Sequence, residues 1–332
     1  MSSRSFNYDV VIVGAGIAGC SFAHALATLS QKPLKICLLE RSLAEPDRIV
    51  GELLQPRGVE TLKIMGMEEC LEGIDAVPAH GYCVVNDGKN VHIPYPEGYQ
   101  GRSFHHGRFI MALRRKARAA PGVDVLERTA TKLIECPYTG KVIGIRVLNK
   151  TENSEGVEEE FYGDLTVIAD GCFSNFRTKV MGEGAAKSEL GSHFVGLILE
   201  NARLPYDEHG TVVLIKGHGP VLLYRISKTE TRMLTAIRVP LPPDLKVRLL
   251  FSPPPYHPGD LSPPRNTSPM KSSLDYPHHF NHPLSEPLKV RGYGGCPTPS
   301  CLPQNKAQNT QRKASFCLEI RGIFVTHSPE VA

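Results

Sequence analysis

Three glycines near the amino terminus have the spacing of a turn that binds a dinucleotide. The apolar run 9–13 (DVVIV) is typical of a buried strand, and Gly14-Ala-Gly16-Ile-Ala-Gly19 follows it directly. In such a turn the first glycine permits a tight bend, the second lets a pyrophosphate approach the backbone, and the third lets a helix pack on the strand. The amino end of that helix offers free N–H groups to the anion. The spacing predicts a dinucleotide site; a glycine-rich turn without a ligand is the alternative.

A carboxylate stands where this turn needs one. Residues 34–39 predict a second strand, and it ends at Glu40, about 20 residues beyond the glycines, where an acidic side chain accepts hydrogen bonds from an adenosine ribose. Between them, apolar residues recur at helical spacing: Ala18, Phe22, Ala25 and Leu29. Because the strand, the helix and Glu40 all stand at the positions that the motif requires, a dinucleotide site is favoured over a glycine-rich turn without a ligand. They do not distinguish FAD from NAD, because both carry the same ADP half.

The elements around this turn predict two folded units and a tail. Strand and helix patterns alternate up to about residue 190, which indicates an α/β unit with a partly parallel sheet. Short strands then follow at 194–199, 212–215, 221–226 and 233–239, which indicates a mainly antiparallel sheet. Roughly half of the 27 prolines fall between residues 252 and 303, where they remove backbone donors. We therefore expect a cofactor domain (7–190, with substrate-lobe segments inserted around 75–105), a partial substrate domain (191–246) and a disordered tail (247–332).

Composition excludes several other classes of protein. The net charge is only +4, and no Lys/Arg block interleaves with aromatic residues, so nucleic acid is not an expected partner. Nine cysteines without a paired CxxC do not indicate a disulfide scaffold or a metal site. His105-His106 lacks accompanying carboxylates, and we expect no metal there. We also expect neither a signal peptide nor a membrane-spanning helix, because no apolar run is long enough.

Several longer motifs resemble squalene epoxidase (squalene monooxygenase), the FAD enzyme of sterol synthesis. The likeness covers roughly residues 7–246. The segments that carry it are Glu40-Arg41, 45–56 (EPDRIVGELLQP), Gly81-Tyr82, 103–114 (SFHHGRFIMALR), 164–177 (DLTVIADGCFSNFR), 192–196 (SHFVG) and 231–238 (TRMLTAIR). The resemblance implies a Rossmann-like FAD-binding domain of the flavin hydroxylase type, followed by a substrate domain.

The resemblance also implies which residues contact FAD. Besides the three glycines, they are Ile17, Ala18, Glu40, Arg41, Arg48, Leu53, Arg114, Ala130, Asp170 and Gly171. The three arginines are suited to neutralising a pyrophosphate through charge-assisted hydrogen bonds. For Arg114 an alternative is that it belongs to the cations that end the helix 108–119. For Asp170-Gly171, which resembles the DG motif of flavin hydroxylases, an ordinary Asp-Gly turn is the alternative.

The implied activity is insertion of one oxygen atom of O2 into squalene to give (S)-2,3-epoxysqualene. Tyr82 and Gln55 resemble residues beside the flavin and the substrate, with Tyr82 orienting Gln55 by a hydrogen bond. Either is alternatively a structural polar group. The implied electron source is NADPH, through NADPH-cytochrome P450 reductase, at the endoplasmic reticulum or microsomal membrane. Two other readings remain open: another flavin monooxygenase of the same fold, and a truncated FAD-binding remnant without turnover.

The sequence also departs from the family. Arg57 stands where the family has glycine. The family's second Gly-Asp motif, which holds the flavin ribityl chain, and its carboxy-terminal membrane helices are not recognisable. Gly259-Asp260 lies in proline-rich sequence, and Gly163-Asp164 opens the strand before Asp170. We expect a frameshifted or unspliced gene model beyond about Lys246, with weak FAD retention and low or absent epoxidase activity as the result.

Overall fold

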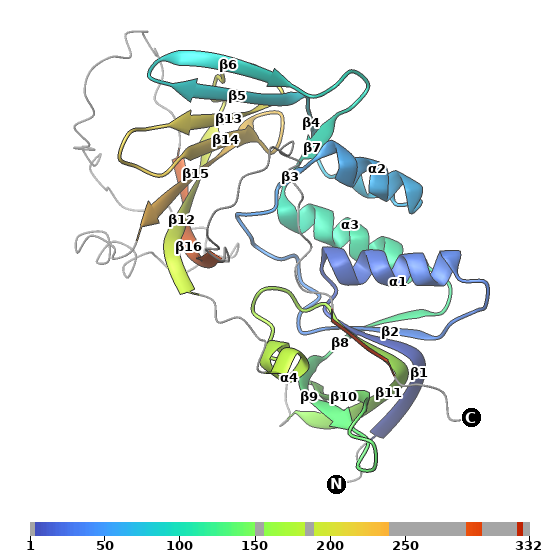
Figure 1. Ribbon diagram of the computed structural model, residues 1–332. Coiled ribbons are helices and arrows are strands. Elements are labelled where there is room, and N and C mark those ends of the chain that lie inside the picture. Colours follow the sequence, from blue (N-terminus) through green and yellow to red (C-terminus); the bar gives the residue numbers. More distant parts are fainter. Residues whose placement is uncertain (1–3, 150–155, 183–188, 239–289, 301–323, 328–332) are drawn as a thin grey trace, which may run out of the picture.

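The protein contains two large sheets joined by a small one (Figure 1). The structure is a computed structural model that describes residues 4–149, 156–182, 189–238, 290–300 and 324–327. The first sheet has the strand order β8-β2-β1-β11-β10-β9, with β17 paired to β11. Its strands are β1 (Arg4–Val13), β2 (Ile36–Glu40), β8 (Val123–Glu127), β9 (Thr129–Glu135), β10 (Val142–Asn149), β11 (Val157–Ile168) and β17 (Phe324–His327).

Parallel strands form the centre of this first sheet. Strand β1 pairs in parallel with β2 and with β11, and β2 pairs in parallel with β8. Side chains of β1 alternate between two cores: Val10 and Ile12 face one, Val11 and Val13 the other. A strand that is buried on both faces needs a continuous apolar run, which explains the composition of residues 10–13. The predicted α/β fold with a partly parallel sheet is confirmed.

Two helices cover one face of the first sheet side by side (Figure 1). They are α1 (Ile17–Leu29) and α3 (His106–Ala119). Small side chains on α1, Cys20 and Ala23, share a core with Leu113 and Ala117 of α3. The remaining helices are α2 (Pro56–Ile64), the 3₁₀ helix η1 (Glu68–Leu71) and α4 (Arg177–Met181). The structure thus positions the amino end of α1 at the carboxyl edge of β1, where the glycine turn lies.

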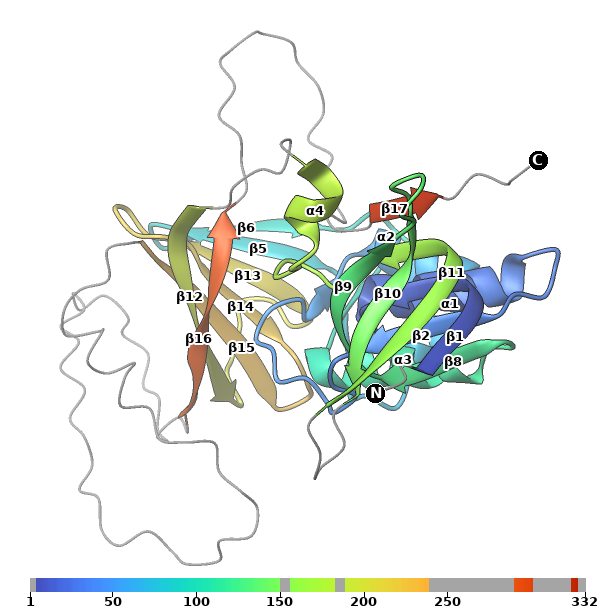
Figure 2. The same cartoon turned by 90° about the horizontal axis from the view of Figure 1, so that it is seen from below.

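The second sheet is mainly antiparallel, as the sequence predicts. Its order is β16-β12-β15-β14-β13-β5-β6, and only the β13–β5 pair is parallel. Strands β5 and β6 come from the segment that we expect to be inserted around residues 75–105, and they lie beside the later strands (Figure 2). The strands are β5 (Gly81–Asn86), β6 (Lys89–Pro94), β12 (Glu189–Glu200), β13 (His209–Leu214), β14 (Val221–Arg225), β15 (Glu230–Arg238) and β16 (Val290–Ser300).

A three-stranded sheet joins the two units. It has the order β3-β7-β4, from β3 (Leu53–Leu54), β4 (Val77–Ala79) and β7 (Gly101–Ser103). Two segments of the expected disordered tail are strands in the structure: β16 pairs with β12, and β17 pairs with β11. The rest of that tail lies outside the described residues. Whether the chain divides at the predicted domain boundaries stays a prediction.

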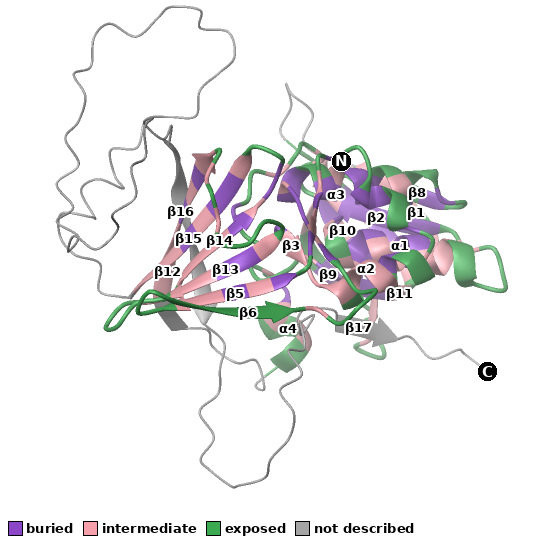
Figure 3. Ribbon diagram, turned by 90° about the horizontal axis from the view of Figure 1, so that it is seen from above, coloured by how far each residue is buried: buried purple, intermediate pink, exposed green. Residues whose placement is uncertain are grey.

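Burial differs sharply between the two ends of the protein. Buried residues concentrate in α1, α3 and the first sheet, whereas β6 is exposed along its whole length (Figure 3). β6 is therefore an unprotected edge strand of the second sheet. Among the described helices, none combines the length and the apolar character that crossing a bilayer requires.

Close packing at one glycine of the turn generates a first prediction. A Cβ on Gly19 would lie 1.8 Å from the Gly14 carbonyl oxygen, whereas a Cβ on Gly16 would meet nothing within 4 Å. We expect Gly19→Ala to lower the free energy of unfolding by about 1–3 kcal/mol or more, because the backbone must move. Gly16→Ala is the matched control and should cost less than about 1 kcal/mol. Urea unfolding measures both, and equal losses would contradict the packing described.

Candidate functional site

The glycine turn leaves the amino end of α1 open. Gly14 has φ +105°, and a Cβ there would lie 2.5 Å from the Ala169 carbonyl oxygen, so only glycine fits between β1 and the segment after β11. Gly16 is the N-cap of α1, and neither a side-chain cap nor an acidic residue occupies the first turn. Helix N-termini have unsatisfied N–H groups and a partial positive charge. The open space at Gly16 therefore lies beside groups that attract an anion.

Glu40 points at this turn from the end of β2. Its Oε2 accepts a hydrogen bond from the Ala15 backbone N–H at 2.9 Å, and its Oε1 accepts one from Ser42 at 3.4 Å. The side chain is 16% exposed, so it is only partly covered by the protein. The expected juxtaposition of turn and carboxylate is present. Contact of Glu40 with a ribose stays a prediction.

Arg114 supports the turn from behind. The guanidinium donates to the carbonyl oxygens of Ala15 at 3.0 Å and Ala44 at 2.9 Å, and it lies 3.5 Å from Glu40. The residue is 7% exposed, whereas the cations of the last helical turn are Lys116 and Arg118. Arg114 is therefore not simply one of the cations at the helix end. A buried cation is stable only when paired and hydrogen-bonded, and here the partners are the turn itself.

The Asp170-Gly171 pair lies on the other side of Gly14. Gly171 has φ +83°, which favours glycine, and the Asp170 Cα would lie 2.8 Å from a Cβ on Gly14. Among the described residues, Asp170 Oδ1 is a buried oxygen without a hydrogen-bond partner. Burial raises the pKa of this carboxyl, although Ser174 and Arg177 act in the opposite direction. An acceptor that is buried and unsatisfied requires an explanation, such as a ligand that donates to it.

These groups fit the ADP half of a dinucleotide. The turn offers N–H groups for a diphosphate, Glu40 offers an acceptor for ribose hydroxyls, and Asp170 offers a second, unpartnered acceptor next to the turn. These three parts come from the ends of three neighbouring parallel strands, β1, β2 and β11. Ligands of α/β sheets bind at the carboxyl ends of such strands.

Some of the other predicted cofactor residues lie close to the glycine turn, and others lie farther from it. Ile17 is 40% exposed at the first turn of α1. Ala130 lies on β9, two residues after Arg128, whose N–H donates to the Glu40 carbonyl at 2.7 Å. Arg41 and Arg48 are exposed, and within the described part of the chain neither is hydrogen-bonded to the turn. Ala18 packs against the core, and Leu53 lies on β3 near Gly210. The roles of these residues stay predictions.

Gln55 and Tyr82 contact one another, as expected, and a third residue joins them. Gln55 Nε2 donates to Tyr82 Oη at 2.5 Å, and Tyr95 Oη donates to Gln55 Oε1 at 2.5 Å. Tyr82 also fills the space above Gly210, where a Cβ would lie 2.8 Å from its ring. The amide is therefore held in one orientation by two phenols. A role of Gln55 or Tyr82 in catalysis is untested.

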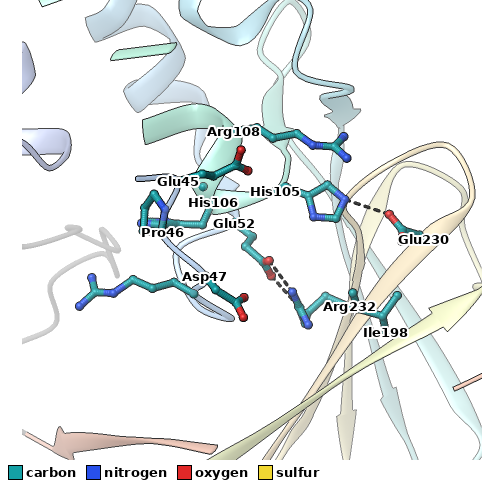
Figure 4. A pocket seen from close by; sticks show the side chains of 12 residues that line it. Glu45, Pro46, Asp47, Glu52, His105, His106, Arg108, Ile198, Glu230 and Arg232 are labelled. Carbon is teal, nitrogen blue, oxygen red and sulfur yellow. Dashed lines mark hydrogen bonds and ion pairs between the residues drawn. The ribbon is translucent and has the colours of Figure 1, made fainter. Parts of the chain in front are cut away.

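A charged cavity of about 420 Å³ lies where the first unit meets the second sheet (Figure 4). Its base is a buried ion pair: Arg232 donates to the two oxygens of Glu52 at 2.8 and 2.7 Å, and the exposed fractions of the side chains are 4% and 1%. Tyr224 adds a hydrogen bond to Glu52 at 3.1 Å. The cavity wall includes Glu45, Asp47, Arg48, His105, Arg108 and Glu230.

The two adjacent histidines point to different partners. His105 Nε2 lies 2.9 Å from Glu230, across the cavity (Figure 4). His106 Nδ1 lies 3.1 Å from the Gly51 carbonyl oxygen. Burial lowers the pKa of His106, which favours the neutral ring. Both histidines thus connect the amino end of α3 to other elements.

Sequence reasoning missed Glu52, Arg232 and Tyr95. Glu52 and Arg232 lie inside two of the motifs quoted above: Glu52 directly precedes β3, and Arg232 lies within β15 among apolar residues. That position is a signal of a buried ion pair, but it does not identify the partner 180 residues away. Tyr95 follows an exposed edge strand and carries no local signal of its contact with Gln55.

Comparison with solved structures defines the class of fold. The chain is similar to pqsL, a probable FAD-dependent monooxygenase from Pseudomonas aeruginosa (TM-score 0.56, 16% identity, 73% of this chain and 62% of that one). It is also similar to the myxobacterial chondrochloren halogenase CndH, an FAD-dependent halogenase (TM-score 0.58, 20% identity, 70% and 53%). A third neighbour is p-nitrophenol 4-monooxygenase PnpA from Pseudomonas putida DLL-E4 (TM-score 0.57, 12% identity, 74% and 62%). The fold is that of FAD-dependent monooxygenases and halogenases.

Comparison of sequences identifies the relatives. Residues 162–266 match the family model of squalene epoxidase. The chain is 43% identical over 234 residues to squalene epoxidase 1 of Arabidopsis thaliana, 44% over 243 residues to squalene epoxidase erg1 of Aspergillus fumigatus, and 41% over 254 residues to squalene monooxygenase of Mus musculus. These matches cover 69%, 70% and 74% of this chain.

The predicted resemblance is confirmed: this chain is a relative of the squalene epoxidases. It spans 42–48% of the length of the three relatives named. The family match continues beyond residue 246, where we expected the likeness to end, and its last part, from residue 239, lies outside the described residues.

The buried ion pair generates a second prediction. We expect Glu52→Gln to lower the free energy of unfolding by about 3–5 kcal/mol, because Arg232 then remains buried without the Glu52 carboxylate. The double variant Glu52→Leu/Arg232→Met should lose less than the single variant, since both buried charges are removed together. The exposed pair Arg57–Glu60 is the matched control, and Glu60→Gln should cost less than about 1 kcal/mol. Similar losses for Glu52→Gln and Glu60→Gln in urea unfolding would contradict this account.

The raised pKa of Asp170 generates a third prediction. A carboxyl whose pKa is raised by burial lowers stability when it is ionised, and this cost disappears as the pH falls and the folded protein takes up the proton. Asp170→Asn should therefore be more stable than the parent at neutral pH, and the difference should vanish below about pH 4. Urea unfolding across this pH range measures the difference, with the exposed Asp164→Asn as control. A difference that grows as the pH falls would contradict the assignment.

Proposed function

We propose that the protein is an FAD-dependent monooxygenase that inserts one oxygen atom of O2 into squalene to give (S)-2,3-epoxysqualene. One observation carries the proposal: the open turn at Gly16, the Glu40 carboxylate and the unpartnered Asp170 oxygen meet in a chain that is 41–44% identical to squalene epoxidases. The turn alone would fit many dinucleotide enzymes. The similarity to squalene epoxidases supports FAD as the cofactor and squalene as the substrate.

The residues of the turn would hold FAD by its ADP half. We assign the diphosphate to the amino end of α1 at Gly16, Ile17 and Ala18, with Glu40 and Asp170 accepting hydrogen bonds from cofactor hydroxyls. Arg41 and Arg48 are exposed cations that would offset the phosphate charge. Arg114 instead keeps the turn in shape, because its hydrogen bonds go to Ala15 and Ala44. When bound, FAD supplies the activation of O2.

The reacting alkene belongs beside Gln55 and Tyr82. Squalene has no polar group, so the charged cavity of Figure 4 does not suit it. Gln55 is fixed by two phenols and offers a rigid polar edge next to β3. Burial is the main cause that raises the pKa of Tyr95, so this phenol stays protonated and continues to donate to Gln55. We infer that Tyr82 and Tyr95 position Gln55, and that protein side chains contribute water exclusion and alignment rather than acid–base chemistry.

The partners of this activity follow from the same resemblance. We propose NADPH as the source of electrons, delivered by NADPH-cytochrome P450 reductase at the endoplasmic reticulum membrane. The dinucleotide turn at Gly14, Gly16 and Gly19 would be occupied by FAD, and NADPH would bind to the reductase.

Turnover of a substrate panel tests the proposed function and generates a fourth prediction. With excess FAD, NADPH and the reductase, the chain should epoxidise squalene slowly and should prefer long apolar polyenes to phenols. Tyr82→Phe should lower the rate about tenfold, equivalent to one ordinary hydrogen bond. Tyr99→Phe, in an exposed turn, is the matched control and should leave the rate unchanged. Mass spectrometry of the products measures the rates.

Two outcomes would contradict the proposal. Oxidation of phenols in preference to polyenes would indicate a different monooxygenase of the same fold. A chain that binds no FAD and oxidises no substrate would be a remnant without turnover. The absorbance of bound flavin near 450 nm distinguishes the two outcomes.

A further inference from the structure

Two histidine side chains meet on the second sheet, away from the glycine turn. His92 lies on the edge strand β6, and His209 begins β13, with β5 between them. In the register, His209 pairs with Gly81 and His92 pairs with Cys83. Because Gly81 and Cys83 are two residues apart, both histidines project from the same face of the sheet. Their Nε2 atoms lie 2.9 Å apart.

A hydrogen bond fixes the tautomer of one ring. His209 Nδ1 lies 2.7 Å from the Asp207 backbone carbonyl oxygen. A carbonyl only accepts hydrogen bonds, so Nδ1 carries the proton, and His209 Nε2 accepts the hydrogen bond from His92 Nε2 when no metal is bound. This is the arrangement that metal-binding histidines have, in which the second ring nitrogen donates to a carbonyl or a carboxylate. On metal binding the His92 proton would move to its Nδ1, which leaves both Nε2 lone pairs as ligands.

Aromatic contacts hold both rings in place. His92 stacks on Tyr206, with centroids 4.4 Å apart and ring planes 8° apart, and Tyr206 lies 5.7 Å from the His209 ring. The surrounding charges are mixed. Glu208 pairs with His80 at 3.2 Å, and the Asp207 carboxylate pairs with Arg225 at 2.8 Å. The rings are therefore ordered before any ligand arrives, which lowers the entropy cost of binding.

The separation of the two nitrogens suits a metal ion. Two imidazoles bound at roughly 2.05 Å in neighbouring positions of a square-planar or octahedral ion would have nitrogens about 2.9 Å apart. We propose that His92 and His209 form a two-imidazole site for a divalent transition metal of the Cu²⁺ or Ni²⁺ type. Within the described residues, no group of three or more His, Cys, Asp or Glu side chains is arranged to hold a metal. Water would therefore fill the remaining positions.

Such an ion would attach the exposed edge strand to the body of the sheet. β6 pairs only with β5 in the described sheet, and the two histidines bridge from it to β13. The chain continues from β6 to Tyr95, which donates to Gln55. Metal binding would thus restrain the segment that carries Tyr95. The proposal does not depend on the proposed function, because it needs neither FAD nor substrate.

Calorimetric titration of the full chain with Ni²⁺, without an affinity tag, tests the site and forms the fifth prediction. We expect one site that weakens about tenfold or more in His92→Gln and in His209→Gln. His218→Gln, an exposed histidine in the turn after β13, is the matched control and should bind as the parent does.

Hydrogen exchange supplies a second readout that a metal bound elsewhere would not change. Ni²⁺ should slow exchange of the amides of residues 89–94 in the parent and in His218→Gln, but not in His209→Gln. Unchanged affinity in both His92→Gln and His209→Gln would overturn the proposal. So would Ni²⁺ binding that leaves the exchange of β6 unaltered.

Discussion

The hydrogen bond between Glu40 and the Ala15 backbone is the contact on which the candidate site depends. It joins the end of β2 to the glycine turn after β1, and Arg114 braces both from α3. Without these contacts a turn of three glycines would have many conformations, since glycine restricts the backbone least. With them, the amino end of α1 follows a turn of fixed shape, and Asp170, whose Oδ1 lacks a partner, lies beside Gly14 of that turn. The backbone of the glycine turn is thus held in one conformation, and Asp170 Oδ1 beside it lacks a hydrogen-bond donor. Both features are expected of a binding site for a polar ligand.

A second constraint joins this site to the other sheet. Glu52 and Arg232 are nearly inaccessible to solvent, and they connect the segment before β3 to β15. Buried ion pairs contribute little net stability but are costly to break. The main effect of the pair is therefore to fix positions: it holds the segment that leads to Gln55 against the sheet that carries Tyr82.

Local pattern predicted the parts of the site that are close together in sequence. The turn at 14–19, the acid at 40 and the Asp-Gly pair at 170 each follow a strand, and strand ends of a parallel sheet meet at one edge. Contacts between distant segments were not predictable in the same way. Arg232 with Glu52, and His92 with His209, depend on a strand register that no single motif specifies. The strands β16 and β17, in the segment predicted to be a disordered tail, were missed for the same reason: each forms by pairing with a strand that is distant in sequence, β12 or β11.

Competition between nucleotides for the turn tests the central claim most directly. FAD fluorescence quenching would give the affinity of the chain for the cofactor, with ADP and FMN as competitors. If the turn, Glu40 and Asp170 hold the ADP half, ADP should displace FAD, and FMN, which lacks that half, should not. Displacement by FMN but not by ADP would contradict the account, because the flavin ring rather than the diphosphate and ribose would then determine binding.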